Sequence, residues 1–183
     1  MGAKNGILFK TAVSLEEAGK IQIVALDKTG TITKGEPQVT DLVPADGISE
    51  EELLIYAYAL EKKSEHPLPK RFLQRQEEKQ ITAREVSDFQ ALPGNGLRAV
   101  LDNEVLTGGS MKYISNQISI APELILQAEK LAGEGKTPLL FTKNNKLIGM
   151  IAVADVMKED SPQAVKELQN MGIRVVMLTG DNE

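Results

Sequence analysis

The sequence predicts an α/β protein in which a parallel-sheet domain is interrupted by an inserted α+β domain with an antiparallel sheet. The parallel sheet is indicated by two short aliphatic runs near the ends of the chain, residues 21–26 and 173–178, each of which leads into a polar loop containing glycine. The inserted domain is indicated by the material between them, where helical periodicity alternates with hairpin patterns.

The composition limits the class of protein. The 183 residues suffice for one ordinary domain or two small ones, and 42% hydrophobic residues is normal for a globular protein. The net charge of −5 argues against a nucleic-acid partner, because phosphate backbones need clustered Lys and Arg. The absence of cysteine excludes a disulfide or a thiolate metal site within these residues and fits a cytoplasmic region.

The inserted domain is expected to open with a helix. Ser49 and Glu52 form a capping box, and the helix after it should run to about Lys63. A second helix is predicted to begin near Pro67. Two hairpins should follow, in which residues 97–101 pair with 105–107 and residues 138–142 pair with 147–154 around polar turns.

Two more helices complete the prediction. One begins at Pro122, runs to Leu131 and has Gly133 near its end. The last helix is expected to start with Ser161 as its cap and Pro162 as its first residue, and Gly172 should stop it.

The predicted domain boundaries follow from this order. Residues 1–35 and 152–183 form the discontinuous parallel-sheet domain, and residues 36–151 form the inserted domain. Two strands do not complete a doubly wound sheet, so the first domain is expected to be incomplete at its C-terminal side. Its open edges favour exposure or self-association with a second copy.

The chemistry is carried first by the loop after the first strand, which reads Asp27-Lys28-Thr29-Gly30-Thr31-Ile32-Thr33. An Asp at the end of a strand can attack phosphorus to form an acyl phosphate. Lys28 and the threonine hydroxyls can stabilise the transferring phosphoryl group, with Mg²⁺ neutralising charge. Gly30 lets the backbone turn closely around that group. The alternative is a structural Asp in a strand-end turn.

This heptad resembles the phosphorylation motif of the P-type ATPases. These pumps share a haloacid-dehalogenase-like, Rossmann-like domain with a class of phosphatases, in which the residue two after the nucleophile is typically a second Asp acting as acid/base. Thr29 stands at that place here. Loss of an acid/base worth roughly 10²–10⁴-fold predicts an acyl phosphate that persists, as a pump requires.

A second motif, Ser64-Glu65-His66-Pro67-Leu68, resembles the nucleotide-domain motif of the heavy-metal branch. The resemblance implies that His66 holds the adenine end of ATP and that Glu61 reads the adenine amino group. A surface or capping histidine and a solvated helix face are the alternatives.

The segment Pro93-Gly94-Asn95-Gly96-Leu97 matches the family's glycine loop, where missing side chains let the nucleotide approach the backbone at Gly94 and Gly96. Gly108-Gly109-Ser110 falls where family members commonly carry Gly-Asn-Arg, so only Gly108 is carried over as a nucleotide-binding residue.

The segment Thr179-Gly180-Asp181-Asn182 resembles the family's hinge-side motif. The resemblance implies that Thr179 hydrogen-bonds the phosphoryl group and that Asp181 orients the nucleotide and the hinge. Asp155 matches the Asp at the second crossing between the domains, and a strand-end cap is the alternative role.

Taken together, the resemblance implies ATP as substrate and Mg²⁺ bound at Asp27 and Thr29. It also implies that this is the cytoplasmic portion of an integral inner-membrane protein, whose membrane helices and actuator domain are partners of this region. Residues 6–37 look most similar to bacterial copper exporters, with zinc or cadmium pumps as alternatives. The family's later Gly-Asp-Gly-x-Asn-Asp motif does not occur before Glu183, so we expect nucleotide binding with little autophosphorylation. A phosphatase and a nucleotide-binding module without chemistry of its own are the rival functions.

Overall fold

A computed structural model describes residues 8, 10–64 and 84–178, which form two compact units. The first unit combines the chain up to Gly35 with the chain from Met157 onward, and the second is Glu36–Val156. The first boundary coincides with the predicted one. The second falls after Val156 and not after residue 151, because the strand β7 (Lys146–Met157) continues through the predicted joint.

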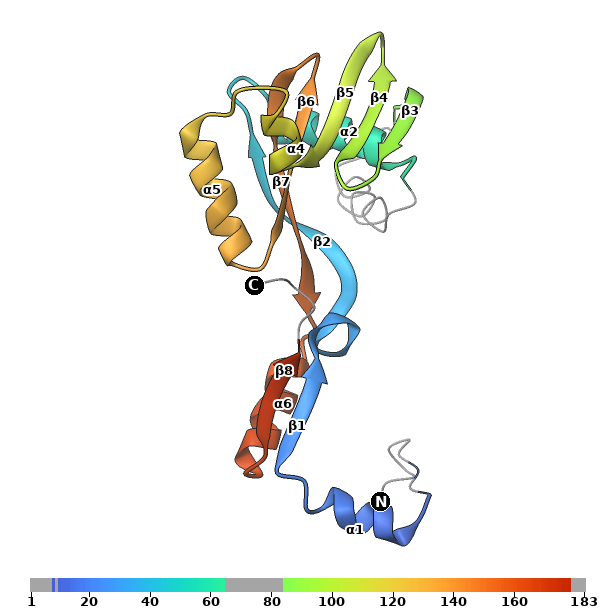
Figure 1. The fold of residues 1–183 in the computed structure, drawn as a ribbon, viewed down its shortest axis with the longest axis vertical. Coiled ribbons are helices and arrows are strands. Elements are labelled where there is room, and N and C mark those ends of the chain that lie inside the picture. Colours follow the sequence, from blue (N-terminus) through green and yellow to red (C-terminus); the bar gives the residue numbers. More distant parts are fainter. Residues whose placement is uncertain (1–7, 9, 65–83, 179–183) are drawn as a thin grey trace. The chain divides into compact units, whose positions relative to one another are not determined.

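The first unit contains a two-stranded parallel sheet of β1 (Ile23–Asp27) and β8 (Arg174–Leu178). The strands are in register from Ile23 opposite Arg174 to Asp27 opposite Leu178, so the two ends of the chain do contribute strands to one parallel sheet. In the described residues of this unit the α-helices are α1 (Ala12–Ala18) and α6 (Ser161–Asn170), and α6 lies along the strand pair in Figure 1.

The aliphatic run of β1 suggests a buried parallel strand, but among the described residues this strand is only partly buried. Val24 and Leu26 are half-buried, whereas Ala25 is exposed and Ile23 is 59% exposed. A continuous apolar run indicates a strand that can be covered on both faces. Whether both faces are covered depends on elements elsewhere in the chain, and the run itself does not specify them.

The second unit contains a six-stranded sheet with the order β2-β7-β6-β5-β4-β3. Its remaining strands are β2 (Thr33–Pro44), β3 (Ser87–Leu92), β4 (Gly96–Leu101), β5 (Glu104–Ser110) and β6 (Thr137–Lys143). Both predicted hairpins are confirmed as the antiparallel pairs β4–β5 and β6–β7. Their turns are Asp102-Asn103 and Asn144-Asn145, and all four residues have φ between 47° and 65°, as type I′ turns require.

The helix α2 (Glu50–Glu61) covers one face of this sheet. The Ser49 hydroxyl accepts a hydrogen bond from the Glu52 N–H at 3.1 Å, which confirms the predicted N-terminal cap. The helix ends at Glu61, slightly before the predicted end near Lys63. The second predicted helix, near Pro67, lies outside the described residues.

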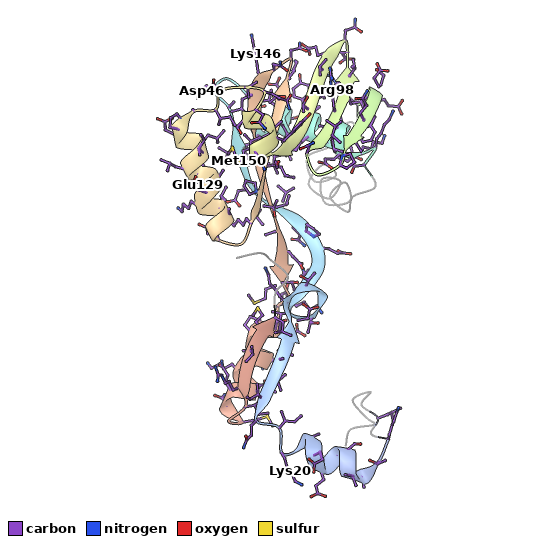
Figure 2. The ribbon with its side chains drawn as sticks, in the orientation of Figure 1. Lys20, Asp46, Arg98, Glu129, Lys146 and Met150 are labelled. Atoms are coloured by element: carbon purple, nitrogen blue, oxygen red, sulfur yellow. The ribbon has the colours of Figure 1, made fainter. Side chains whose placement is uncertain are left out.

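The core of the second unit lies on both faces of the sheet, because neighbouring strand residues point to opposite sides. Phe141 and Ile151 pack with α2, whereas Leu140 and Met150 pack with residues of α4 (Met111–Ser115) and α5 (Pro122–Gly133). Met150 lies between the sheet and α5 in Figure 2. Both faces of this sheet therefore carry buried apolar side chains.

The helix α6 begins differently from the prediction. Asp160 and not Ser161 is the N-cap residue, and it makes no side-chain capping bond. Ser161 is the first helical residue, and its hydroxyl donates instead to the carbonyl of Ile32, far away in the sequence. Among the described residues, no helix is both long and apolar enough to cross a membrane.

Candidate functional site

Asp27 is the last residue of β1, and its side chain is exposed. One carboxylate oxygen, Oδ1, accepts a hydrogen bond from the Thr29 N–H at 3.3 Å, so the side chain also caps the loop that follows. The strand therefore places a carboxylate at its carboxyl end, where it is open to a reactant and held by a backbone donor. These are the properties that a nucleophile for phosphorus needs.

The loop after Asp27 begins with a tight turn. Thr29 has φ −75° and ψ 121°, and Gly30 has φ 76° and ψ −17°. These angles are those of a type II turn, which favours glycine at its third position. A Cβ on Gly30 would meet no atom within 4 Å, so the backbone conformation and not crowding is what calls for glycine here.

Thr33 fixes the shape of this turn from within. Its hydroxyl accepts a hydrogen bond from the Gly30 N–H at 3.2 Å and donates one to the Lys28 carbonyl at 2.9 Å. Thr33 is only 4% exposed, so water competes little for either bond. The last threonine of the motif is thus a brace for the loop, a role that the sequence pattern did not suggest.

The loop is also held by the segment that leads into α6. The Lys158 ammonium donates to the Gly30 carbonyl at 2.8 Å, and the Lys158 N–H donates to the Ile32 carbonyl at 3.0 Å. The Ser161 hydroxyl donates to the same Ile32 carbonyl at 2.8 Å. Sequence reasoning missed Lys158 altogether, since no local pattern links it to a loop so distant in the chain.

Glu61 is the predicted nucleotide-binding residue with the most unusual environment. It ends α2, is 5% exposed, and burial raises the pKa of its carboxyl group to about 7. Near neutral pH this group can therefore donate a hydrogen bond when protonated or accept one when ionised. Such a perturbed carboxyl group is a common mark of a functional site.

The predicted glycine loop is a turn between β3 and β4 that lies against β5. Gly94 has φ 73°, and the Asn95 carbonyl accepts a hydrogen bond from the Ser110 N–H at 3.2 Å. Gly96 lies opposite Gly109, and a Cβ on Gly96 would stand 2.1 Å from the Gly108 carbonyl oxygen. The glycine at position 96 is therefore required by close packing of two backbones.

Gly108 is placed beside the end of α2. A Cβ on Gly108 would stand 2.7 Å from the Phe141 ring and 2.9 Å from Leu60, the residue before Glu61. The structure thus brings Gly96, Gly108 and the end of α2 together within the second unit. Core packing against Phe141 and Leu60 explains why position 108 is glycine. Contact between Gly108 and a nucleotide stays a prediction.

The departure from the family pattern at Gly109 has a steric explanation. A Cβ at this position would stand 2.4 Å from the Asn95 carbonyl oxygen and 3.0 Å from the Tyr113 ring. The glycine-loop turn occupies the space that an Asn side chain would need. In this chain the turn therefore closes onto β5 more tightly than a larger residue at 109 permits.

The other predicted residues are placed as follows. The Asp155 carboxylate accepts a hydrogen bond from the Glu36 N–H at 3.2 Å, which fastens β7 to β2 within the second unit. Asp27, Lys28 and Thr29 belong to the first unit, whereas Glu61 and the glycines belong to the second. His66, Thr179 and Asp181 lie outside the described residues.

At the end of β1 the described residues offer one exposed carboxylate, that of Asp27, as a ligand for a cation. In the described part of the chain, no three His, Cys, Asp or Glu side chains gather into a metal site. Mg²⁺ binds through one or two carboxylates and keeps its remaining positions for water and phosphate oxygens. The single exposed carboxylate of Asp27 is compatible with this mode of binding, and Thr29 stands beside it in the loop.

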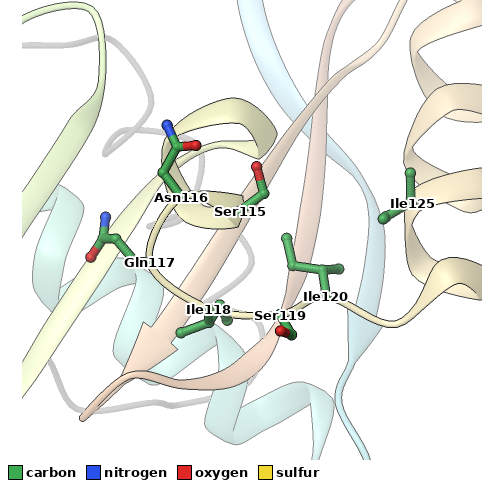
Figure 3. Close-up of a pocket in the computed structure, with 7 residues that line it drawn as sticks. All are labelled: Ser115, Asn116, Gln117, Ile118, Ser119, Ile120 and Ile125. Carbon is green, nitrogen blue, oxygen red and sulfur yellow. The ribbon is translucent and has the colours of Figure 1, made fainter.

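The structure also has a shallow hollow of about 430 Å³ beside α4 and α5 (Figure 3). It is lined by Ser115, Asn116, Gln117, Ile118, Ser119, Ile120 and Ile125. None of these is a predicted site residue, and none carries a charge that could meet a phosphate. We therefore assign no part of the nucleotide site to it.

Comparisons with known proteins agree with these motifs. The family of haloacid dehalogenase-like hydrolases matches residues 21–183. Copper-transporting ATPase 1 of Rhizobium meliloti (strain 1021) is 39% identical over 181 residues, which are 98% of this chain and 22% of that protein. The probable copper-exporting P-type ATPase of Archaeoglobus fulgidus is 41% identical over 181 residues, which are 99% of this chain and 22% of that protein. The chain thus spans about a fifth of these relatives.

Solved structures match both units. A zinc-transporting PIB-type ATPase in its E2.Pi state superposes with a TM-score of 0.88 at 34% identity, covering 99% of this chain and 29% of that one. The N-domain of HMA8, a copper-transporting P-type ATPase, matches 64% of this chain and 99% of its own, with a TM-score of 0.54 at 25% identity. The chain therefore belongs to the haloacid dehalogenase-like hydrolase family, within which it is a catalytic region of the heavy-metal P-type ATPase type.

Proposed function

We propose that this chain is the catalytic region of a pump that exports a heavy-metal cation, copper in the first place, and that within the intact ATPase it binds ATP and accepts the terminal phosphoryl group on Asp27. The observation that carries this proposal is the exposed carboxylate at the end of β1, held by the Thr29 N–H and followed by no second acid at position 29. The matching ATPases support the wider role.

The reaction is a transfer of the γ-phosphoryl group. A carboxylate oxygen of Asp27 forms a bond to the γ-phosphorus while the bond from that phosphorus to the β–γ bridging oxygen breaks, and ADP leaves with the electron pair. A water molecule later attacks the same phosphorus, which releases phosphate and restores the carboxylate. Lys28 and the N–H groups of the braced loop are suited to stabilise the transferring group. When bound at Asp27, Mg²⁺ neutralises phosphate charge.

The nucleotide would be held by the second unit. Gly96 and Gly108 lie near the end of α2, where Glu61 is, Gly94 precedes Gly96 in the same turn, and His66 follows α2 in the sequence. A Cβ on Gly94 would meet no atom within 4 Å, so the backbone there is open to a ligand, and the buried carboxyl group of Glu61 can meet an adenine amino group. The proposed location is the cytoplasmic side of a membrane, with the membrane helices and actuator domain of the same longer protein as partners.

The phosphatase alternative is disfavoured by Thr29. A phosphatase of this family gains speed from a carboxyl group that protonates the leaving group and activates water. Within the described loop, position 29 offers a hydroxyl group instead. An intermediate that breaks down slowly fits a pump and not a phosphatase.

Replacing Asp27 tests the central proposal. In the intact ATPase, Asp27→Asn is expected to lower the acid-stable, hydroxylamine-sensitive phosphoprotein formed from γ-labelled ATP by more than about 10³-fold. Nucleotide affinity should stay within about twofold, because Asn keeps the shape of the side chain. His66→Ala is the matched variant and should weaken nucleotide binding instead. A phosphoprotein that survives in Asp27→Asn would refute the assignment.

The identity of the ion is tested in the same assay. Relatives that are named as copper ATPases favour Cu(I), whereas the similarity to a zinc-transporting structure favours Zn²⁺. We expect Cu(I) to stimulate turnover of the intact ATPase more than Zn²⁺ or Cd²⁺. Preferential stimulation by Zn²⁺ or Cd²⁺ would move the assignment to the alternative class.

A further inference from the structure

Three hydrogen bonds join the loop after Asp27 to the segment that begins α6. Two of them, from the Lys158 N–H and the Ser161 hydroxyl, end on the Ile32 carbonyl at 3.0 and 2.8 Å. The third runs from the Lys158 ammonium to the Gly30 carbonyl at 2.8 Å. Ile32 and Ser161 are each 6% exposed, whereas the bond to Gly30 is at the surface. The base and the tip of the loop are thus held in different ways.

The bonds to Ile32 account for the attachment of the loop. A buried carbonyl oxygen with two donors is fully satisfied, and its loss of one donor would be costly. These two bonds are enough to attach the loop to the segment before α6, so the bond from the Lys158 ammonium to Gly30 is not needed for attachment. The bond from the Lys158 ammonium reaches past this anchor to the residue with positive φ at the turn, so it acts on the shape of the turn.

The bond from Lys158 to the Gly30 carbonyl affects the Asp27 carboxylate through Thr29, which lies next to Gly30 in the chain and bonds that carboxylate. The Gly30 N–H is held by Thr33 and the Gly30 carbonyl by Lys158, so both peptide groups of Gly30 are fixed. Since peptide units are planar and their C=O and N–H point in opposite directions, the Thr31 N–H is fixed as well. On the other side of Gly30, the Thr29 N–H bonds the Asp27 carboxylate.

We infer that Lys158 is a positioning residue for phosphoryl transfer, which holds the Gly30 peptide so that the turn presents the Asp27 carboxylate and the loop N–H groups in one arrangement. Ser161 anchors the base of the same loop. The inference rests on the proposed phosphorylation of Asp27 and adds to it a residue from the second part of the discontinuous unit. A charged donor suits this task because charge-assisted hydrogen bonds are about twice as strong as neutral ones.

The test compares three lysine variants of the intact ATPase. Lys158→Met keeps the length of the side chain without a donor, and Lys158→Arg keeps a charged donor. Lys146→Met makes the same change at an exposed lysine of β7, in the other unit (Figure 2). The measurements are the rate of phosphoenzyme formation by acid quench, the nucleotide dissociation constant and the melting temperature.

Lys158→Met is expected to slow phosphoenzyme formation about tenfold or more, because small misplacements of reacting groups are costly. The nucleotide dissociation constant should stay within about twofold, Lys158→Arg should recover most of the rate, and Lys146→Met should match the unmodified protein. A rate in Lys158→Met equal to that of the unmodified protein would overturn the inference. So would equal losses of rate, affinity and melting temperature, which indicate a merely structural lysine.

Ser161→Ala provides a second measurement at the buried end of the contact. It removes one donor from the Ile32 carbonyl and should slow phosphoenzyme formation in the same direction, with a lower melting temperature. The failure of the two proposals can be told apart. Absence of an Asp27-dependent phosphoenzyme in the unmodified protein refutes the proposed function, whereas its presence at equal rates in all variants refutes only the inference about Lys158.

Discussion

At the scale of the single residue, Glu61 shows how burial adapts an ordinary side chain. Its carboxyl group has an unperturbed pKa of 4.5, and burial raises the pKa to about 7. A raised pKa means that the folded state prefers the protonated form. The stability that protonation provides is complete below pH 4.5 and is lost as the pH rises through 7.

Glu61→Gln is therefore expected to stabilise the second unit at alkaline pH. Glutamine keeps the size of the side chain and never ionises, so the variant should gain about 2–3 kcal/mol over the unmodified chain at pH 8, a difference that shrinks towards pH 5. Urea denaturation between pH 5 and 8 measures it. Glu51→Gln, at an exposed position of the same helix, is the control for the loss of a carboxylate on α2. A pH-independent gain at position 61 would contradict the assigned cause.

At the scale of the secondary-structure element, the hairpins could be predicted because their turns are specified locally. Asp102-Asn103 and Asn144-Asn145 tolerate positive φ, and the apolar runs on either side fix the strands. The start of α6 could not be predicted in the same way. Ser161 has the chemistry of a cap, but its hydroxyl is engaged by the distant Ile32 carbonyl. A local sequence pattern does not show that a distant carbonyl group will take the hydroxyl of Ser161 away from capping the helix.

In the candidate site, too, the features set by local sequence could be predicted and those set by long-range contacts could not. The position of Asp27 at a strand end and the turn at Gly30 follow from the local sequence. The bonds from Lys158 do not, because they need the register of β1 with β8 and the path of the chain between β7 and α6. The packing reasons for Gly96 and Gly108 were also inaccessible, since they depend on which strands and side chains become neighbours.

The packing of β4 on β5 gives a prediction about Gly96. A Cβ there would stand 2.1 Å from the Gly108 carbonyl oxygen, and backbone atoms cannot move aside cheaply. Gly96→Ala should lower the free energy of unfolding by about 2–3 kcal/mol or more. Gly133→Ala is the matched control: this glycine ends α5 with nothing within 4 Å, and the change should be neutral or stabilising by up to about 1 kcal/mol. Equal effects of the two changes in chemical denaturation would refute the steric explanation.

At the scale of the whole molecule, the two units differ in how much they bury. Both hydrophobic clusters of the described residues lie in the second unit, on the two faces of its sheet. In the first unit, large apolar side chains such as Ile23, Met171 and Met177 are at least half exposed. Since burial of apolar surface is the main source of stability, the second unit should be the more stable one.

The fragment Glu36–Val156 is therefore expected to fold by itself. It should unfold cooperatively at the same denaturant midpoint, within about 0.3 M, as the more stable transition of the 183-residue chain. In hydrogen exchange of the whole chain, amides of β5, β6 and β7 should be the slowest and those of β1 and β8 much faster. A fragment that does not fold, or equal protection in both sheets, would contradict this division.

The parallel pairing of β1 with β8 has a consequence for biosynthesis. Ribosomes add residues from the N-terminus at about 5–20 per second, so β1 leaves the exit tunnel on the order of ten seconds before its partner strand is made. Throughout that interval β1 lacks the strand with which it pairs, β8, while the segment between the two strands can already begin to fold. Nascent β1 is thus the part of this polypeptide for which a holding chaperone has the most time to act.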